Sequence, residues 1–371
     1  MSKVELLVGG VYYGGWQTID IQRGIEQIAG TFELQVTEYW PGSGTPQQIS
    51  PGAACQVLID GETVITGYVD TAVPSYDDSQ HSVTVSGRDK TADLVDCAAI
   101  YKSGAWSNRK LEQIAADLCQ PFGIEVKAEI DTGAAFIAYS IQEGETVFEC
   151  LERATRMRAV LLVSDGLGRL VITRAGSDKA AASLEQGKNI LLARGEFSWK
   201  DRFSQITVKG QAQGNDDVYG ETVAHPSATA TDATINRYRP LIVLAEDQGH
   251  AATLKQRAAW EANVRRGRGN RATVTINGWK HASGLWRPNT LVNIDSGFLA
   301  INAELLIAGV RYTLNAQGER TELSLAMREA FDLIVGVKGT RLESAIKGRD
   351  GAAQAVTGEK KKKKSQDWTG L

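Results

Sequence analysis

The sequence predicts a mainly β protein of the α+β class, with two related antiparallel β-barrels, a small α+β domain and a smaller inserted helical/β domain. Three observations favour this fold class. Segments that alternate apolar and polar residues, as half-buried strands do, fill both ends of the chain. Helical spacing of apolar residues is found in a few stretches between them. A pattern of turns and strands in the first β region recurs in the last.

The first β-barrel is expected over residues 1–100. Strands are predicted at residues 4–8, 32–36, 55–59, 64–69 and 82–86, since each is an alternating or apolar run between turn residues. The chain has 38 glycines and 8 prolines, a balance that favours many tight turns between strands. Turns of this kind are predicted at Gly9-Gly10, Pro51-Gly52 and Asp60-Gly61.

The small α+β domain is expected over residues 101–180. Its first helix begins at the N-cap Asn108, ends before Pro121, and has an apolar face of Leu111, Ile114, Ala115 and Leu118. Its second helix begins with the capping box formed by Thr146 and Glu149, and its buried stripe consists of Val147, Leu151 and Ala154. Two short strands, at residues 159–163 and 169–173, complete the domain.

The second β-barrel is predicted to be discontinuous, covering residues 181–245 and 272–331. Residues 203–210 form one of its strands, and residues 211–236 form a long mobile loop rich in glycine, aspartate, asparagine and threonine. A helical insertion, residues 246–271, interrupts the barrel and buries Leu254, Ala258 and Val264. Residues 332–371 form a basic flexible C-terminal tail, with nine lysines and arginines against five acidic residues.

The relationship between the two barrels is inferred from an internal repeat. The first copy reads Pro51-Gly52-x-x-Cys55-x-Val57, then Ile65-x-Gly67, then Val83-x-Val85. The second reads Pro288-Asn289-x-x-Val292-x-Ile294, then Ile307-x-Gly309, then Leu323-x-Leu325. The order of strands, the turn and the glycine after the second strand are all predicted to recur.

Composition excludes several protein classes. The sequence contains no apolar run of the ~18 residues that a membrane helix needs, and its first residues lack the features of a secretory signal, so synthesis in a cytoplasm is expected. Four cysteines are scattered singly among apolar residues. They are expected to be free and buried, the alternative being a disulfide or a metal-binding pair.

No motif for catalysis or for binding a cofactor or a metal ion is recognised. The sequence has no GxxxxGK[ST], HExxH or GxSxG motif, and its four histidines are far apart. Asp77-Asp78 and Asp216-Asp217 are expected to be solvated turn residues, with a metal site as the alternative. We therefore predict that the protein is not an enzyme and uses no cofactor.

Two basic stretches leave two interpretations open. Residues 265–271 resemble an arm that contacts phosphates, but cations and a glycine also suit the end of a helix. Lys360–Lys364 is a continuous run that favours disorder, the alternative being contact with DNA or an acidic partner.

Several motifs resemble, in their order along residues 4–331, those of the baseplate hub proteins of Mu-like contractile-tailed phages and related prophages. The clearest are Gly14-Gly15-Trp16, Arg23-Gly24-Ile25, Ile65-Thr66-Gly67-Tyr68-Val69-Asp70, Gly87-Arg88-Asp89-Lys90, Asp201-Arg202-Phe203-Ser204, Val208-Lys209-Gly210-Gln211 and Trp286-x-Pro288-Asn289. The family-motif positions expected to be structural are Gly15, Trp16, Arg23, Gly24, Gly67, Gly87, Arg88, Asp89, Arg202, Phe203, Gly210, Pro288 and Asn289. Among them, Gly15, Gly67 and Gly87 are expected to allow tight turns at strand ends. Arg88 and Asp89 are expected to form ion pairs, within one chain or between chains.

The resemblance implies two tube-protein-like barrels per chain and a homotrimer, so that six barrels form a pseudo-sixfold ring. It also implies a structural role in the virion, at the tail baseplate, after assembly in the host cytoplasm. The trimer would join the hexameric tail tube to the trimeric central spike and contact other baseplate proteins. It would form part of the cell-puncturing tip and of the channel for DNA, with passing contact with phage DNA in the lumen and no small-molecule substrate.

Three alternatives remain at the level of sequence. One is the hub of a headless contractile bacteriocin particle, which the sequence does not distinguish from a phage hub. Another is a hub that also cleaves peptidoglycan. The third is a nucleic-acid-binding module that uses the two basic stretches, which the mildly acidic remainder of the chain disfavours.

Overall fold

The computed structural model describes residues 2–37, 49–78, 81–158, 160–210, 226–245 and 251–331. Its largest element is a sheet of thirteen strands, to which both ends of the described chain contribute. The first β unit, as we name it, consists of β1 (Val4–Val8), β2 (Val11–Tyr13), β3 (Thr18–Gly24), β4 (Thr31–Thr37), β5 (Ala54–Ile59), β6 (Glu62–Tyr76) and β7 (His81–Asp89). The second β unit consists of β13 (Lys179–Glu185), β14 (Ile190–Phe197), β18 (Asn270–Asn277), β21 (Leu291–Ser296), β22 (Ile301–Asn315) and β23 (Gly318–Ala326).

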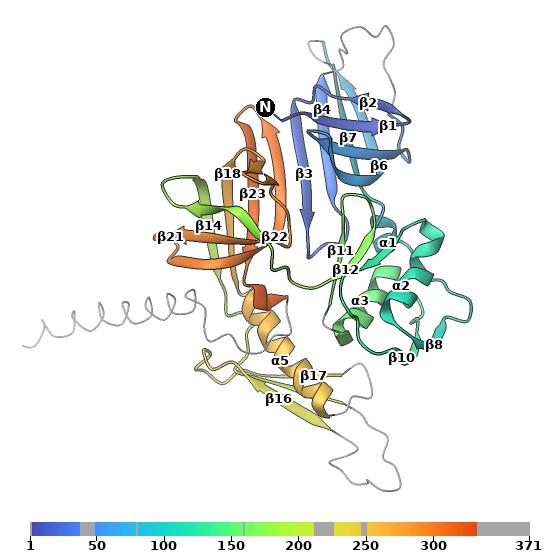
Figure 1. The fold of residues 1–371 in the computed structure, drawn as a ribbon, viewed down its shortest axis with the longest axis vertical. Helices are drawn as coiled ribbons and strands as arrows, with labels where there is room; N and C mark the ends of the chain where they lie inside the picture. The colour runs from blue at the N-terminus through green and yellow to red at the C-terminus, as the bar shows by residue number, and fades with distance from the viewer. Residues whose placement is uncertain are drawn as a thin grey trace, which may run out of the picture.

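The two β units form one continuous sheet. Its strand order is β14-β18-β23-β22-β3-β4-β7-β6-β5-β1-β2, with β13 pairing with β21 and β21 with β22. Figure 1 shows β22 of the second unit beside β3 of the first. The expected pair of closed barrels is not confirmed, since the described strands leave free edges at β2 and β14.

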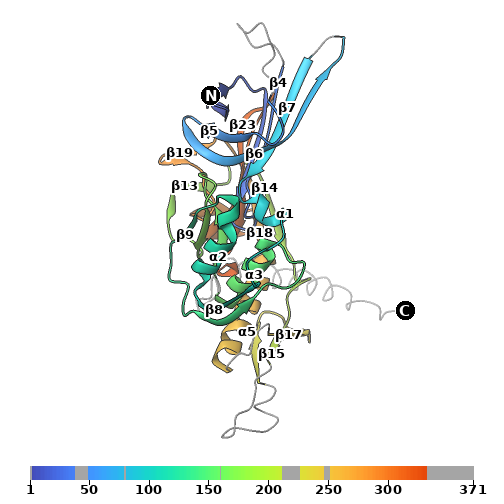
Figure 2. The same cartoon turned by 90° about the vertical axis from the view of Figure 1, so that its right-hand side faces the viewer.

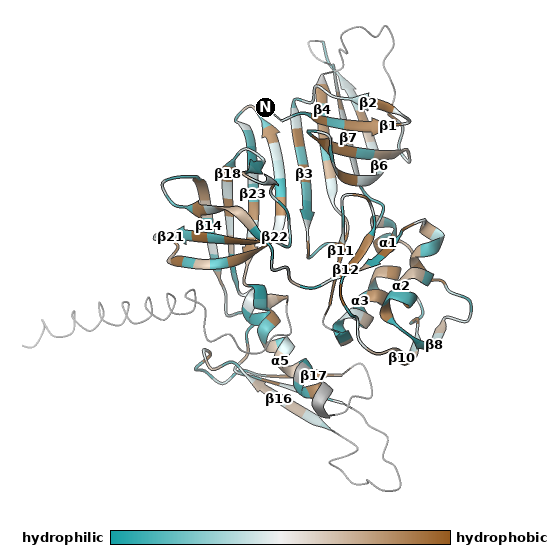
Figure 3. Ribbon diagram, viewed as in Figure 1, coloured by the Kyte–Doolittle hydropathy of each residue, from teal (hydrophilic) through white to brown (hydrophobic). Residues whose placement is uncertain are grey.

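One hydrophobic core serves both units. Alternating apolar side chains of the first unit, such as Leu6, Ile21 and Leu34, belong to the same buried cluster as Val274 and Ile307 of the second. Figure 3 shows this alternation as brown and teal bands along the strands. Burial of apolar surface at about 25 cal/mol per Å² is the main stabilising contribution of such a core, so the units are coupled energetically.

The predicted repeat is present in the sheet, but the residue correspondences predicted for its second and third strands are wrong. The first unit has the strand order β5-β6-β7-β4-β3, and the second has the equivalent order β21-β22-β23-β18-β14. Both long strands carry a bulge, between Val69 and Thr71 in β6 and between Ile307 and Gly309 in β22. Cys55 pairs with Gly67, whereas its counterpart Val292 pairs with Leu305. Gly67 therefore corresponds to Leu305, and the glycine after the second strand does not recur.

The turn that opens the repeat does recur. Gly52 and Asn289 both have positive φ, 81° and 63°, and both donate their N–H to the long strand of their unit. The acceptors are the carbonyls of Val69 at 2.7 Å and Ile307 at 2.8 Å. An asparagine tolerates the left-handed conformation better than most residues that have a Cβ, which explains the substitution of glycine by Asn289.

A small α+β region follows the first β unit. It contains α1 (Ala92–Asp96), β8 (Ala105–Arg109), α2 (Leu111–Cys119), η1 (Gln120–Phe122), β9 (Val126–Ala128), β10 (Phe136–Ser140), α3 (Val147–Arg158), β11 (Leu161–Ser164) and β12 (Leu170–Thr173). The Thr146–Glu149 capping box is confirmed, with N···O distances of 2.8 and 3.2 Å, and so are the buried stripes of both helices. Asn108 is not an N-cap: it lies in β8 with positive φ, and Lys110 precedes α2.

The insertion is larger than predicted. Strands β15 (Gln205–Lys209), β16 (Ser227–Thr231) and β17 (Pro240–Leu244) form a separate three-stranded sheet, which packs on α5 (Ala251–Arg268). Figure 1 shows these elements below the main sheet, and Figure 2 shows the elongated profile that results. Residues 203–210 are thus not a strand of the second barrel, and β16 lies within the predicted loop at 211–236. Short elements β19 (Lys280–His281), β20 (Gly284–Leu285) and η2 (Arg328–Ala330) complete the described chain.

Other sequence expectations have mixed outcomes. Cys55, Cys119 and Cys150 are free and buried, but Cys97 is exposed. None of the helices that the structure describes has the length and apolarity to cross a membrane. Asp216-Asp217, the C-terminal tail at 332–371 and its run Lys360–Lys364 lie outside the described residues.

Candidate assembly interface

The two β units of one chain are joined by the pairing of one strand from each. Strands β3 and β22 pair antiparallel, from Gly309 opposite Gly24 to Leu314 opposite Ile19. Ile25 donates its N–H to the carbonyl of Ala308 at 2.8 Å. A Cβ on Gly24 would lie 3.0 Å from that same carbonyl oxygen, so the close approach of the strands favours glycine there.

Charge also contributes to this junction. The guanidinium of Arg311 on β22 binds the carboxylate of Asp20 on β3, with Nε 2.9 and 3.0 Å from the two oxygens and a further contact through Nη2. The side chains are partly exposed, and a bidentate pair of this kind favours one register of the strands. We expect a contribution of about 1 kcal/mol or less at such exposure.

Besides β2 and β13, two further edges of the main sheet lack a neighbouring strand within the described chain. β14 pairs with β18 on one side, and no described strand lies on its other side. In β6, residues 62–68 pair with β5, whereas residues 71–76 pair with β7 alone among the described strands. Open edges present unpaired N–H and C=O groups and are templates for pairing with another strand.

Apolar side chains are exposed at both of these edges. Leu192 of β14 is 61% exposed and its neighbour Leu191 is also exposed. On β6, Val73 is 50% and Tyr76 is 83% exposed. These candidate interface edges were not identified from the sequence. The adjacent leucines, in a strand that also contains the charged residues Arg194 and Glu196, were the available signal.

Gly67 and Gly87 lie inside strands and not at strand ends, contrary to expectation. A Cβ on Gly67 would be 1.8 Å from the carbonyl oxygen of Arg88, and one on Gly87 would be 2.1 Å from that of Tyr68. Both glycines therefore allow β6 and β7 to approach closely beside the bulge. Gly15, with a φ of 78°, is the one of the three that supports a turn, and the adjacent Trp16 is buried in the main core.

Asp89 connects the first β unit to the α+β region. It is 1% exposed, and it accepts hydrogen bonds from the N–H groups of Gly30 and Thr66 and from Ser164 Oγ, at 2.8, 3.3 and 2.9 Å. Arg23 lies nearby and donates to the Ser164 carbonyl at 3.0 Å. Burial raises the pKa of Asp89 to about 6, although Arg23 and these donors act in the opposite direction.

The neighbouring Arg88 forms ion pairs within its own chain. Its Nη2 lies 2.8 Å from Asp96, and its Nε lies 2.6 Å from Asp70, the bulge residue of β6. The hydrogen bonds that Arg88 donates to Asp96 and Asp70 raise its pKa further above the usual range. Arg88 and Asp89 thus have separate partners, although they are consecutive in the sequence.

The remaining motif positions lie in the insertion or beside the linker between β12 and β13, residues 174–178. Buried Arg202 pairs with buried Asp232, with Nη2 2.7 Å from Oδ2. The ring of Phe203 lies near two guanidinium groups, with its centroid 5.2 Å from Cζ of Arg239 and 5.4 Å from that of Arg265. Gly210 packs on Leu254, where a Cβ would be 3.2 Å away. The turn of Pro288 and Asn289 binds the linker, since Asn289 Oδ1 accepts the Gly176 N–H at 2.8 Å.

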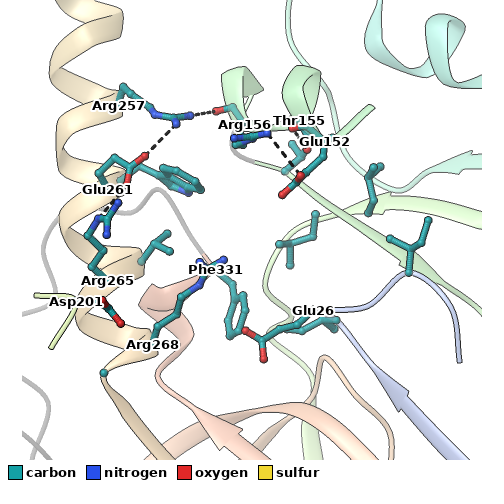
Figure 4. Close-up of a pocket in the computed structure, with 18 of the residues that line it drawn as sticks. Glu26, Glu152, Thr155, Arg156, Asp201, Arg257, Glu261, Arg265, Arg268 and Phe331 are labelled. Atoms are coloured by element: carbon teal, nitrogen blue, oxygen red, sulfur yellow. Dashed lines mark hydrogen bonds and ion pairs between the residues drawn. The ribbon is translucent and has the colours of Figure 1, made fainter. Parts of the chain in front are cut away.

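A cleft with a volume of about 660 Å³ lies between the α+β region and α5. Figure 4 shows that its lining mixes both signs of charge. Arg257 and Arg265 both bind Glu261, at 2.9 and 3.3 Å, and Arg156 pairs with Glu152 at 3.5 Å. The basic stretch at the end of α5 is thus engaged in ion pairs, among them Arg266 with Asp232 and Arg271 with Glu26, which favours its structural interpretation.

Comparison with known proteins covers nearly the whole chain. The family models that match are the Mu phage baseplate assembly protein GpP-like N-terminal domain (residues 3–89), the baseplate hub protein gp44-like second domain (91–174), the NMB1110-like tail protein third domain (202–259) and the GpP fourth domain (250–334). The chain is 41% identical over 340 residues to the baseplate hub protein gp44 of Escherichia phage Mu, with 89% of each chain covered.

Solved structures agree with these matches. The 43 kDa tail protein of prophage MuSo2 from Shewanella oneidensis has a TM-score of 0.79 at 40% identity, over 89% of this chain and 99% of that one. The tail protein from Neisseria meningitidis MC58 has a TM-score of 0.77 at 25% identity, over 89% and 98%. A likeness of fold extends to the E. coli type VI secretion component c3393, with a TM-score of 0.54 at 11% identity over 87% and 76%.

Proposed function

Because the chain belongs to the baseplate hub protein family of phage Mu, we propose that it forms a homotrimer that joins the hexameric tail tube to the trimeric central spike. Hub proteins of this family are structural components of the tail baseplate in the virion. The trimer would form part of the cell-puncturing tip, contact other baseplate proteins and enclose part of the channel through which phage DNA passes.

The observation that supports the trimer is the repeated strand order of the two β units. Each chain supplies two units that share one sheet and one core. Three chains would supply six such units, so the assembly could match a sixfold tube on one side and a threefold spike on the other. This role is mechanical and requires no catalytic group.

The solution mass of the purified chain tests the trimer directly. Light scattering over a range of concentrations should give a mass near three times 40.1 kDa, and negative-stain images should show pseudo-sixfold rings. A chain that remains a monomer at every concentration, with and without its spike, would contradict the proposal. A peptidoglycan zymogram should show no clearing, and clearing would support a hub that also cleaves the cell wall.

A further inference from the structure

The two open edges, β14 and residues 71–76 of β6, correspond in the repeat to the two strands that meet at the junction within a chain, β3 and β22. Ser86 and Ser324 are equivalent reference positions in the two units. Each lies opposite the residue that directly follows the bulge of the long strand, Thr71 in β6 and Gly309 in β22. Counted from these serines, residues 71–76 of β6 correspond to residues 309–314 of β22, which is the segment that pairs with β3. In the same way β14 corresponds to β3, the strand that β22 binds.

The correspondence between β3 and β14 is fixed residue by residue. Asp20 pairs with Glu33, which lies opposite Ser86. Arg194 pairs with Thr273, which lies opposite Ser324. Asp20 therefore corresponds to Arg194. Within one chain, β3 has a partner strand of the β22 type, whereas no described strand occupies the equivalent edge of β14.

We propose that β14 of one copy pairs antiparallel with residues 71–76 of β6 in a second copy, in the register that β3 takes on β22. This inference rests on the proposed trimer and names the strands at its seam. The pairs would place Phe197 opposite Ala72, Gly195 opposite Pro74, Arg194 opposite Ser75 and Ala193 opposite Tyr76.

The exposure of equivalent residues supports this partner. Leu314 of β22 is 5% exposed, whereas Tyr76, at the corresponding position of β6, is 83% exposed. The same place in the repeat is therefore buried where a neighbouring strand is present and open where it is missing. The equivalent edge of β22 pairs with β3, the strand to which β14 corresponds.

The seam between copies would be weaker than the junction within a chain. Pro74 has no N–H to donate, whereas its counterpart Tyr312 has one. The counterparts of Arg311 and Asp20 are Val73 and Arg194, so the ion pair of the in-chain junction is absent from the seam. We therefore expect the trimer to dissociate at three equivalent seams upon dilution, leaving each chain's own sheet intact.

Cysteine cross-linking tests the strands and the register. Ser75→Cys with Arg194→Cys places the two thiols on directly opposite residues of neighbouring copies, within the Cα separation that a disulfide spans. Oxidation of the full-length chain should give covalent dimers and trimers on a non-reducing gel. The matched control is Ser82→Cys with Arg194→Cys, because Ser82 lies opposite Ser75 on β7, one strand away from the seam, and it should remain monomeric.

A transplanted ion pair provides a second measurement. Val73→Arg with Arg194→Asp reproduces the Arg311–Asp20 pair at the seam, and should tighten each seam about threefold beyond the product of the single effects, or roughly 30-fold over three seams. Ile137→Arg with Arg194→Asp changes the net charge equally at an exposed site on β10 and should show no such coupling.

The outcomes separate the seam from the proposed function. A trimer in which the Ser75→Cys, Arg194→Cys variant gives no cross-link above the control, and in which the transplanted charges show no coupling, would overturn the strand pairing and leave the hub trimer standing. Absence of any trimer of the unmodified chain, with its spike present, would overturn both.

Discussion

Gly67 and Gly87 lie side by side in β6 and β7, where the backbone of each strand occupies the space that a Cβ of the other would need. Gly67→Ala would force the pair apart beside the bulge, because the nearest contact, at 1.8 Å, is a backbone oxygen with little freedom to move. We expect a loss of about 3 kcal/mol or more in the free energy of unfolding, measured by denaturant titration. Gly297→Ala, which meets no atom within 4 Å, should change it by less than about 0.5 kcal/mol; an equal loss would contradict the steric cause.

Asp89 makes stability depend on pH in a direction opposite to that of most paired carboxylates. Because burial raises its pKa to about 6, the folded state retains the proton where the unfolded state has lost it. The contribution of Asp89 to the free energy of unfolding therefore falls as the pH rises from about 4 to 6. Asp89→Asn has no such titration, so its stability relative to the natural chain should improve by up to about 3 kcal/mol between pH 4 and pH 7.

Denaturant titrations of both chains at four pH values measure this difference. The control is Asp78→Asn at an exposed position, whose stability relative to the natural chain should hardly change with pH. A relative stability of Asp89→Asn that is flat or falls with pH would show that Arg23 and the hydrogen-bond donors outweigh burial.

At the scale of elements, the insertion contains a buried ion pair that joins the start of β15 to the end of β16. Arg202 and Asp232 are both buried at the base of β15–β17. Arg202→Met leaves the Asp232 carboxylate with Arg266 as its remaining arginine partner, so the expected loss lies below the about 3–5 kcal/mol of a fully uncompensated buried charge. Arg202→Met should therefore speed amide hydrogen exchange in β15–β17 and α5. It should leave β4 and β7 unchanged, because no described strand joins the two sheets. Exposed Arg237→Met is the control, and faster exchange throughout the main sheet would argue against an independent insertion.

The elements that the sequence predicts well are those with local signals. The α3 capping box depends on residues three apart, and the strands of the first unit depend on alternation, so both were visible without tertiary structure. The assignment of β15 was wrong because an alternating strand carries no mark of the sheet that it joins. The role of Gly67 was also missed, since the opposing carbonyl of Arg88 belongs to another strand.

The sequence indicated that two related units form the interface, but it did not indicate which strands and residues lie there. The repeat indicated two related units, yet the residue-level match of Gly67 with Gly309 slipped by four positions. Gly67 lies three residues before the bulge of β6, whereas Gly309 directly follows the equivalent bulge of β22, and a bulge leaves no sequence signal. Free edges depend on which strands meet, which is a property of the whole sheet. Leu191 and Leu192 become informative when β14 is known to lie at an edge.

At the scale of the whole molecule, the shared sheet and the shared core make the two β units one cooperative body. Residues of both units contact one another in a single buried cluster, and the β3–β22 junction carries the Asp20–Arg311 pair. We expect β4 and β23 to lose protection against hydrogen exchange at the same denaturant concentration, in dilute solution where the chain is a monomer. Asp20→Ala with Arg311→Ala should lower that concentration for both strands equally, whereas Arg202→Met should shift neither. If β23 opened while β4 stayed protected, the units would be separate domains that touch at one strand pair, and the ring would have six equivalent weak points in place of three.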